Sequence, residues 1–460
     1  MGTVKATEAP AHQVSGEQRS LSREQKEAVG LLSIGTFLEY FDLMLYVHMA
    51  VLLNELFFPK TDPFTTSLLS AFAFCTTYLL RPFGALLFGY IGDSIGRKAT
   101  VIITTMMMAL SCLVMANLPT YSQIGITASW LVTICRMVQG LSAMGEVAGA
   151  NIYITEITKP PIQYPAVMVT AICSALGGSL ALFVATLVTN LNFNWRNAFW
   201  IGAGVAIVGV AARTRLRETP DFADAKRRVE KALIKNAQDP KILQQNVIWR
   251  ERVKKKAALS LFFIECSWPV CFYIAYMYCG NILKTTFHFS AEQIISQNLA
   301  VSLIQLFSWL ILSYLSYIIY PLKILRIRFT IFLIFMLLCP YLLDNVKSPL
   351  EVLMIQAFIA VFGFMGIPAM PIFYKRFPVF KRFTYTTFAY ALSRALVYVV
   401  TSFGLVYCEK LFGNWGILVI LVPTAILFIY ALNYFEKLEK VDYDLDQKEH
   451  HNYSLQEDCA

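Results

Sequence analysis

Charged residues are scarce in this 460-residue chain. They make up 15% of it, whereas 57% is hydrophobic and the mean hydropathy is +0.55. Soluble domains are about 25% charged and about 45–50% apolar. The shortage of charge therefore excludes an ordinary water-soluble fold and predicts a chain embedded in a membrane. The apolar stretches do not alternate with polar residues over about ten positions, as β-barrel strands do, so the predicted spans are helices.

Patterns that supply enzymatic chemistry are also missing. The ten cysteines lie mostly inside apolar runs and have no ligand spacing with histidine. We interpret them as free thiols rather than as disulfides or a metal site. No nucleophile–base set and no phosphate-binding loop is present. We therefore predict that the chain is not an enzyme and holds neither a metal nor a cofactor.

A cleavable signal peptide is not expected, because residues 1–28 are polar and the first apolar run is too long for a signal sequence. A spanning helix needs roughly 20 mostly apolar residues. Pairing apolar windows with breaks predicts an all-α membrane protein with twelve spans, at residues 29–53, 67–91, 99–118, 123–153, 165–189, 196–214, 257–281, 291–317, 327–343, 350–374, 383–408 and 412–435.

The lysines and arginines are distributed unevenly between the two sides. Placing both termini on one side puts 31 of them there, 5 on the other side and three inside spans. Cytoplasmic loops carry the excess of these residues, so both termini are predicted to be cytoplasmic. The location is a plasma membrane, which is the inner membrane if the source is bacterial. The net charge of +9 thus reflects topology rather than a nucleic-acid partner.

A long polar insertion divides the spans into six and six. The predicted organisation is a tail at 1–28, a six-helix bundle at 29–214, a cytoplasmic linker at 215–256, a second bundle at 257–435 and a tail at 436–460. The linker contains a stretch suited to a short amphipathic helix, and the last tail is interpreted as flexible. Two six-helix halves joined by such a loop are typical of transporters built from repeated halves.

Span 1 carries two acids, Glu39 and Asp42, three residues apart and so on one helix face. Carboxyl groups at mid-span depth are costly unless they face a polar interior. They could form a proton or cation site, or a counter-charge for a substrate. Alternatively, they pair with Arg81 on span 2, and both roles can hold together.

Span 4 carries a stripe formed by Arg136, Gln139 and Glu146 at helical spacing, separated by small residues. One cation, one amide and one anion along a stripe suit an inner cavity. Small residues alone would indicate ordinary packing between helices.

Spans 7 and 11 carry the remaining buried charges. Glu265 shares a face with Trp268, and an acid beside aromatic rings suits a cationic group. Arg394 lies near the centre of span 11, with Tyr390 on its face. An arginine at that depth needs a partner. That partner is either a substrate carboxylate, which Arg binds bidentately, or a carboxylate of the protein such as Glu265.

The stretch RPFGALLFGYIGDSIGRKAT, residues 81–100, joins spans 2 and 3 through a charged turn. GDSIGRK resembles the signature between spans 2 and 3 of the major facilitator superfamily. GTFLEYFDLMLY, RMVQGLSAMGE, ITEITKPP, WRNAFWIG and RLRETPDF make residues 35–222 resemble its metabolite:proton symporters, which include proline/betaine transporters. The second half is similar mainly through FPVFKRFTY.

The resemblance implies alternating access by two rocking bundles, driven by a proton gradient. It implies that Asp93, Arg97 and Lys98 form a cytoplasmic latch between the halves. Asp93 can cap the amides of span 3 or meet the positive end of another helix. The loop between spans 8 and 9, Ser313 to Arg328, lacks the family's acid and Gly-Arg pair. The predicted latch is therefore one-sided. The tail also lacks the coiled coil that some members carry.

Three functions remain open. The first is proton-coupled import of a zwitterion such as proline or glycine betaine. In it, Arg394 or Arg136 holds the carboxylate, with Gln139 nearby. Glu39, Asp42 or Glu265, with Trp268 and tyrosines such as Tyr390, faces the cation and relays the proton, and Glu146 is a further candidate for proton coupling. The second is proton-coupled transport of a carboxylic acid. The third is a transporter-like receptor that moves nothing. The expected partners are a small molecule, a proton and the lipid bilayer, and we expect a monomer.

Overall fold

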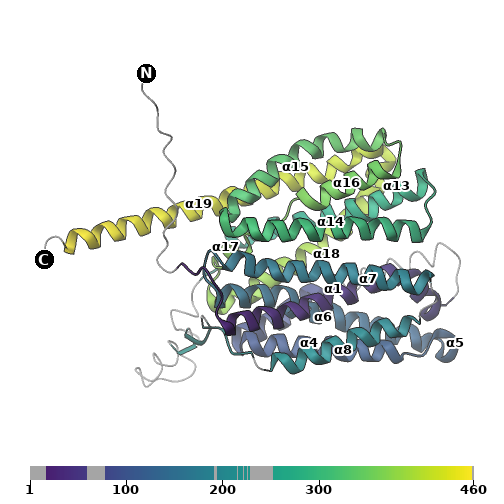
Figure 1. Ribbon diagram of the computed structural model, residues 1–460, viewed down its shortest axis with the longest axis horizontal. Coiled ribbons are helices and arrows are strands. Elements are labelled where there is room, and N and C mark those ends of the chain that lie inside the picture. The colour runs from purple at the N-terminus through teal and green to yellow at the C-terminus, as the bar shows by residue number, and fades with distance from the viewer. Residues whose placement is uncertain are drawn as a thin grey trace.

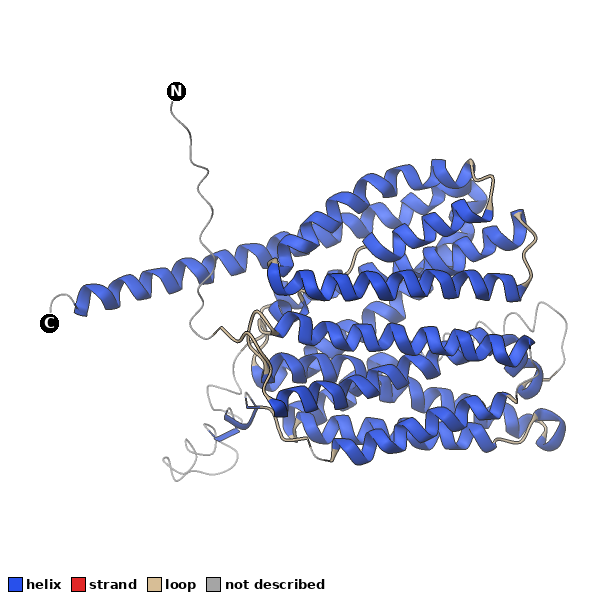
Figure 2. Cartoon of the chain, viewed as in Figure 1, coloured by secondary structure: helices blue, strands red, loops and turns tan. Residues whose placement is uncertain are grey.

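The computed structural model describes residues 17–59, 78–190, 194–214, 216–220, 222–224, 226–227 and 252–457. In this part of the chain all regular structure is helical (Figure 2). The first half holds α1 Arg23–Phe57, α3 Arg81–Ser94, α4 Arg97–Asn117, α5 Tyr121–Ile124, α6 Ile126–Ile157, α7 Gln163–Asn190 and α8 Trp195–Arg213.

The second half begins after the linker, most of which lies outside the described residues. It holds α12 Lys255–Phe272, the π-helix η1 Tyr273–Tyr278, α13 Cys279–Thr286, α14 Ala291–Ile318, α15 Pro321–Asp344, α16 Pro349–Phe362, α17 Met370–Tyr374, α18 Val379–Phe412, the 3₁₀ turn η2 Gly413–Gly416 and α19 Ile417–Glu457. The helices run along a common direction in stacked layers (Figure 1).

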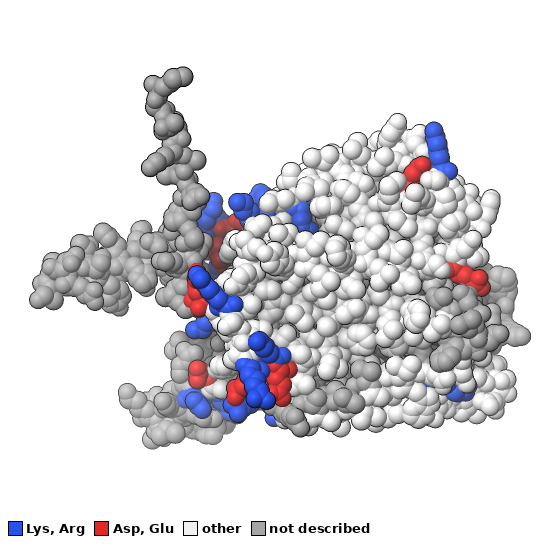
Figure 3. All heavy atoms as spheres, in the orientation of Figure 1, with Lys and Arg blue, Asp and Glu red and all other residues white. Residues whose placement is uncertain are grey.

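Several helices meet the requirements for crossing a membrane. By length and composition alone, five described segments are long and apolar enough: Arg97–Asn117, Gln163–Val184, Lys255–Thr286, Glu292–Ile318 and Val379–Val441. Charged side chains gather at the end from which α19 extends, and a broad uncharged belt covers the middle of the visible face (Figure 3). The count of twelve spans stays a prediction.

Helices of the same half account for most of the packing. In the first half α1 packs along α7, and α4 packs against α6 and α8; in the second, α12 packs against α18 and α19, and α14 against α16. The two halves meet mainly along two helix pairs, α7 with α14 and α3 with α18, and α17 and α18 also contact the first half through α6. A space enclosed between these two pairs is bordered by both halves.

Glycines let two of these helices approach closely. A Cβ on Gly177 of α7 would lie 2.2 Å from the carbonyl oxygen of Phe37 in α1. A Cβ on Gly84 of α3 would lie 2.7 Å from the carbonyl oxygen of Leu141 in α6. Small residues are what allow membrane helices to pack backbone to backbone.

Two predicted spans of the second half are irregular. The span predicted at 257–281 continues to Thr286 and passes through a π-helical segment after Pro269. The span predicted at 350–374 is broken, because α16 ends at Phe362 and α17 begins only at Met370. The broken stretch contains Gly363, Gly366 and Pro368, residues that do not favour a continuous helix.

The tail prediction was wrong for residues 436–457. Instead of a flexible segment, α19 continues without interruption to Glu457 and extends beyond the bundle (Figure 1). Its first turns outside the apolar stretch are held by side-chain contacts. Glu436 pairs with Arg326 of α15, and Glu439 pairs with Arg376 and accepts a hydrogen bond from the Tyr320 hydroxyl at 2.6 Å.

Candidate functional site

An ion pair between α12 and α18 lies at the centre of the molecule. Arg394 Nη1 is 2.6 Å from Glu265 Oε2, and both side chains are buried. The same nitrogen donates to the Ser393 hydroxyl at 3.0 Å, and the guanidinium lies 3.5 Å from the centre of the Tyr390 ring. The second carboxylate oxygen of Glu265 is buried and has no hydrogen-bond partner among the described residues. Protonation of Glu265 would therefore release Arg394 for another carboxylate.

The central cavity lies on one side of this pair, with a volume of about 80 Å³. One water needs roughly 10–15 Å³ in this measure, so the cavity has room for a small molecule. Its charged lining residues are Arg81 and Arg394. Eight aromatic rings also line it: Tyr40, Tyr78, Trp268, Phe272, Tyr276, Trp309, Tyr390 and Tyr398. The lining combines two cations with many aromatic faces.

A second chamber of about 70 Å³ lies on the other side of Arg394. It shares Tyr40, Trp268, Trp309, Tyr390 and Arg394 with the central cavity. Glu265 lines the second chamber and is absent from the lining of the first. The lining side chains that bear hydroxyl or amide groups and are not on α18 are Thr36, Tyr40, Asn151, Thr170, Ser174 and Tyr374.

Tyr40 and Tyr390 separate the two spaces. Their hydroxyl oxygens lie 3.4 Å apart, one from α1 and one from α18. Residues of α1 and α12 that line only the second chamber, such as Thr36 and Glu265, precede those that line only the central cavity, such as Met44 and Phe272. The second chamber is thus nearer the end at which α1 and α12 begin.

The structure places Arg81 against Glu39. Arg81 Nη2 is 3.2 Å from Glu39 Oε1, and both side chains are at most 3% exposed. The Arg81 guanidinium also lies 4.9 Å from the centre of the Tyr78 ring. Arg81 lines the central cavity, whereas Glu39 lines neither described space. The side chains of Asp42 and Glu146 lie outside the described part of the structure.

Two residues predicted to contact substrate lie elsewhere. Arg136 Nη1 donates to Gln139 Oε1 at 2.7 Å, within α6. Both side chains are buried, but neither belongs to the lining of the central cavity or of the second chamber. Helical spacing correctly puts them on one face, but it does not say which neighbour that face meets.

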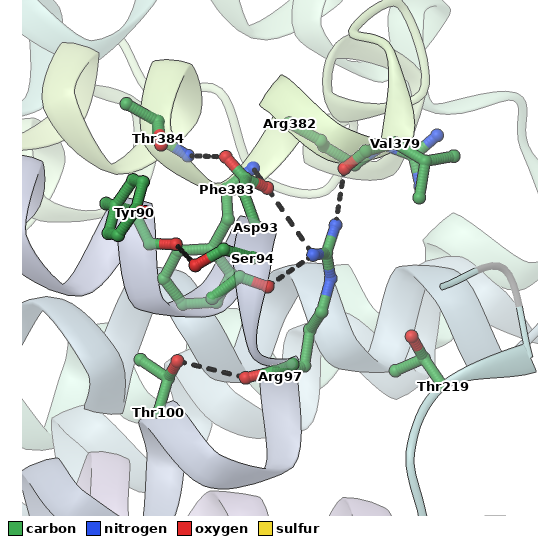
Figure 4. Close-up of polar contacts among 12 residues, drawn as sticks. Tyr90, Asp93, Ser94, Arg97, Thr100, Thr219, Val379, Arg382, Phe383 and Thr384 are labelled. Carbon is green, nitrogen blue, oxygen red and sulfur yellow. Dashed lines mark hydrogen bonds and ion pairs between the residues drawn. The ribbon is translucent and has the colours of Figure 1, made fainter. Parts of the chain in front are cut away.

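The turn between α3 and α4 contacts the beginning of α18 (Figure 4). Asp93 accepts hydrogen bonds from the backbone amides of Phe383 at 3.1 Å and Thr384 at 2.8 Å. The sequence predicts that Asp93 either caps the amides of span 3 or meets the positive end of another helix. In the structure it contacts another helix, α18. Burial raises the pKa of the Asp93 carboxyl above its ordinary value, although Arg97 and the two amides oppose that shift.

Arg97 is fully buried and connects three segments. It lies 3.4 Å from Asp93, donates to the Val379 carbonyl of α18 at 2.6 Å, and pairs with Glu156 of α6 at 3.2 Å. Its guanidinium stacks over the Phe222 ring at 4.8 Å. The neighbouring residue Lys98 contributes its backbone amide, which donates to Glu218 at 3.3 Å.

Sequence reasoning missed the partners of Arg97. Glu156 also accepts from Arg382 of α18 at 2.9 Å and from the Thr219 hydroxyl at 2.6 Å. We name the cluster of Asp93, Arg97, Glu156, Thr219 and Arg382 the latch cluster. A usable signal existed, because these residues lie in GDSIGRK, ITEITKPP, RLRETPDF and FPVFKRFTY. These are four of the segments that carry the family resemblance, and they converge in space.

Comparisons with known proteins agree with this architecture. The family model of the Major Facilitator Superfamily matches residues 32–405. The proline/betaine transporter of Salmonella typhimurium is 29% identical over 302 residues, covering 63% of this chain and 59% of the relative. An inner membrane metabolite transport protein of Escherichia coli is 34% identical over 208 residues, covering 43% and 47%. The chain thus spans about three fifths or less of these relatives.

Solved structures show the same fold at low sequence identity. The proton:xylose symporter XylE matches with a TM-score of 0.69 at 13% identity, covering 90% of this chain and 95% of that one. The transporter FucP, in an outward conformation, matches with a TM-score of 0.65 at 13% identity, covering 90% and 99%. The fold class predicted from the sequence is confirmed. With the match of the family model over most of its length, the chain belongs to the major facilitator superfamily of multi-pass membrane transporters.

Proposed function

We propose that this protein is a secondary transporter that imports a small zwitterion, such as proline or glycine betaine, by proton symport. The observation that carries the proposal is the lining of the central cavity, which sets Arg394 and Arg81 among eight aromatic rings. The names of the relatives support it, since they describe proline/betaine transport. Cytoplasmic termini and an inner-membrane location remain part of the proposal.

Arg394 is the proposed binding group for the substrate carboxylate. Its guanidinium lines the cavity, and arginine binds carboxylates bidentately. Glu265 holds it at 2.6 Å in the structure, so the substrate carboxylate and the Glu265 carboxylate compete for the same cation. Neutralising Glu265 with a proton favours the substrate, and this competition ties substrate binding to proton binding.

Aromatic rings are proposed to bind the cationic end of the substrate. Trp268 and Trp309 lie with their ring centres 6.0 Å apart, and Phe272 and Tyr276 lie 4.9 Å apart along the same side. A cation within about 6 Å of such ring faces is attracted by the ring quadrupole, by roughly 2 kcal/mol or more when desolvated. A quaternary ammonium group, which cannot donate hydrogen bonds, suits such faces.

Alternating access is the proposed mechanism, with the latch cluster as the contact that closes one end. Asp93 and Arg97 of the first half bind the first turns of α18 in the second half. Breaking these contacts would let the second chamber open at that end. Lys98 is assigned a supporting role, since its amide binds Glu218.

A carboxylic acid is the second candidate substrate. The observation that favours it is that both charged residues lining the central cavity are arginines. A dicarboxylate or tricarboxylate would use Arg81 and Arg394 together, whereas a zwitterion needs one of them.

A competition experiment separates the two substrates. Uptake of labelled glycine betaine and proline is measured in cells that overproduce the protein, with an excess of unlabelled zwitterions or of citrate and ketoglutarate. We expect inhibition by the zwitterions and loss of uptake with a protonophore. Inhibition by the acids but not by betaine would select the second candidate. Absence of uptake for both classes in reconstituted vesicles would favour a receptor.

A further inference from the structure

The second chamber shares several lining residues with the central cavity, but Glu265 lines the second chamber only. It lies beyond the layer formed by Tyr40, Tyr390 and Arg394, on the side where α1 and α12 begin. Its volume of about 70 Å³ is enough for roughly five waters, at 10–15 Å³ each. The polar groups in its lining make it suited to hold water.

Polar side chains line this chamber next to Glu265. The Thr170 hydroxyl donates to Asn151 Oδ1 at 2.6 Å, and Tyr374 shares a hydrogen bond with Asn151. Buried waters need about three polar partners each, and these groups together with Thr36 and Ser174 supply them. The chamber therefore has polar groups that can hold water next to Glu265.

Glu265 differs from the other described acid of the membrane interior, Glu39. Both are paired with an arginine, at 2.6 Å and 3.2 Å. However, Glu265 lines the second chamber, whereas Glu39 lines neither of the two described spaces. A proton can be delivered only to a carboxylate that water reaches. The geometry thus favours Glu265 over Glu39, two of the acids that the sequence offers for relaying the proton.

We propose that Glu265 carries the coupled proton and that the second chamber is the compartment through which this proton leaves. The proposal rests on the proton symport proposed above. In the state open to the side opposite the second chamber, a hydronium ion on that side transfers its proton to Oε1 of Glu265 and leaves water behind, and Arg394 then binds the substrate carboxylate. When the substrate has left, the proton passes from Glu265 to a water of the second chamber, and the Glu265–Arg394 ion pair forms again.

The groups around Glu265 are consistent with this exchange. The charged or titratable ones are Arg394 and Tyr390 on α18, Tyr374 on α17, Tyr40 on α1 and Cys266 on its own helix. Arg394 is the cation among them. Asn151 and Tyr374 are positioning residues, because they order water without touching substrate.

The first test needs no substrate. Infrared difference spectra of the full-length protein in lipid bilayers, recorded across pH steps, report the carbonyl band of a protonated carboxylic acid. We expect a band that grows on acidification, is missing in Glu265→Gln and persists in Glu39→Gln, the matched paired acid. Persistence of the band in Glu265→Gln, or its loss only in Glu39→Gln, would overturn the assignment.

The second test addresses the chamber. After a rapid alkaline jump, the band of Glu265 should decay at least about tenfold more slowly in Asn151→Leu, a barrier higher by about 1.4 kcal/mol. Thr170→Val keeps the side-chain shape and should slow the decay as well. Asn117→Leu, at the exposed end of α4, is the control. Unchanged decay in both chamber variants would rule out the exit route.

A third measurement separates this proposal from the proposed function. In vesicles, Glu265→Gln should lose accumulation of labelled glycine betaine driven by a pH gradient but keep its exchange across the membrane. If wild-type vesicles move neither betaine nor proline, the substrate proposal fails while the infrared result still decides the proton site. If Glu265→Gln still accumulates betaine, the proton assignment fails alone.

Discussion

At the scale of single residues, arginines paired with acids define the interior. Arg81 with Glu39, Arg97 with Glu156 and Arg394 with Glu265 are each buried ion pairs at 3.2 Å or less. Buried pairs contribute little net stability, because desolvation offsets their attraction, but removing one partner leaves an uncompensated charge. Their presence therefore points to function, and their disruption has measurable consequences.

The Glu39–Arg81 pair yields a prediction on stability. Replacing Arg81 by Met alone leaves a buried carboxylate, and we expect a loss of about 3–5 kcal/mol in the free energy of unfolding. The double variant Arg81→Met, Glu39→Leu should recover most of that loss. Unfolding of the purified protein in mild detergent, followed by tryptophan fluorescence, measures both. If the double variant is as unstable as the single one, the loss does not come from the unpaired Glu39 carboxylate.

Asp93 yields a prediction on pH. Burial raises its pKa in the closed latch cluster, so the closed state binds the Asp93 proton more tightly than an open state with a hydrated carboxyl does. Acidification on the side of the latch cluster should thus stabilise the closed state. This stabilisation should disappear as the pH rises through the raised pKa of Asp93. Spin labels at residues 159 and 323, one in each half, would report the distance between the two halves. Asp93→Asn should abolish this pH dependence, and an unchanged dependence would contradict the assignment.

At the scale of elements, close helix contacts and helix breaks shape the site. α3 packs against α18 and α7 against α14, so the central cavity is enclosed by helices of both halves. The break between Phe362 and Met370 brings Met365, Gly366 and Ile367 to the lining of the second chamber. Irregular backbone at membrane depth is tolerated where it lies within protein or lines a cavity. The break between α16 and α17 lines the second chamber and so meets this condition.

Gly177 yields a prediction at this scale. Its Cβ would lie 2.2 Å from the Phe37 carbonyl oxygen, so Gly177→Ala forces α7 away from α1. We expect a loss of about 1–3 kcal/mol in stability, as for other overpacked sites. Gly204→Ala is the matched control, since no described residue lies within 4 Å of a Cβ placed there, and it should be neutral or stabilising by less than about 1 kcal/mol. Equal effects of both substitutions would argue against close α1–α7 packing.

Sequence patterns predicted the elements better than their contacts. Hydropathy indicated long apolar helices, and the charged turn at 93–98 located one end of the molecule. The partners of these residues were not predictable in the same way. Asp93 binds amides 290 and 291 positions away, and Arg382 reaches Glu156 across 226 positions. Helical periodicity shows which residues share a face, but it does not show which helix that face meets.

Trp309 and Gln305 illustrate the same limit in the cavity. Both lie on α14 and line the central cavity, where Gln305 accepts a hydrogen bond from Tyr276 at 2.9 Å. In the sequence they stand within an apolar run without a charge to single them out. Conversely, Arg136 and Gln139 were singled out by their charge and spacing, yet they line neither space. Burial of a polar group indicates a partner, and only the fold shows which partner it is.

At the scale of the whole molecule, the two halves are held together at one end by the latch cluster and the Phe383 ring. This ring lies between the first half's Gly92 and Gly149, where a Cβ would come within 2.8 Å and 2.9 Å of it. Within the second half, Arg326 pairs with Glu436 and Arg376 pairs with Glu439 of α19.

Gly149 yields a prediction on the conformational equilibrium. In Gly149→Leu the side chain occupies the position of the Phe383 ring, so the latch end cannot close fully. The distance between spin labels at residues 159 and 323 should shift to longer values than in the wild type. Gly204→Leu, at a site with open space around it, should leave the distribution unchanged. A shift of equal size in both variants would attribute it to general destabilisation.

The most direct test of the account follows substrate and proton together. Vesicles containing the purified protein and an internal pH dye receive labelled glycine betaine under an inward proton gradient. The account predicts accumulation above equilibrium, acidification of the interior that depends on betaine, and loss of both in Arg394→Ala. Accumulation that persists in Arg394→Ala, or betaine uptake without proton entry, would contradict it.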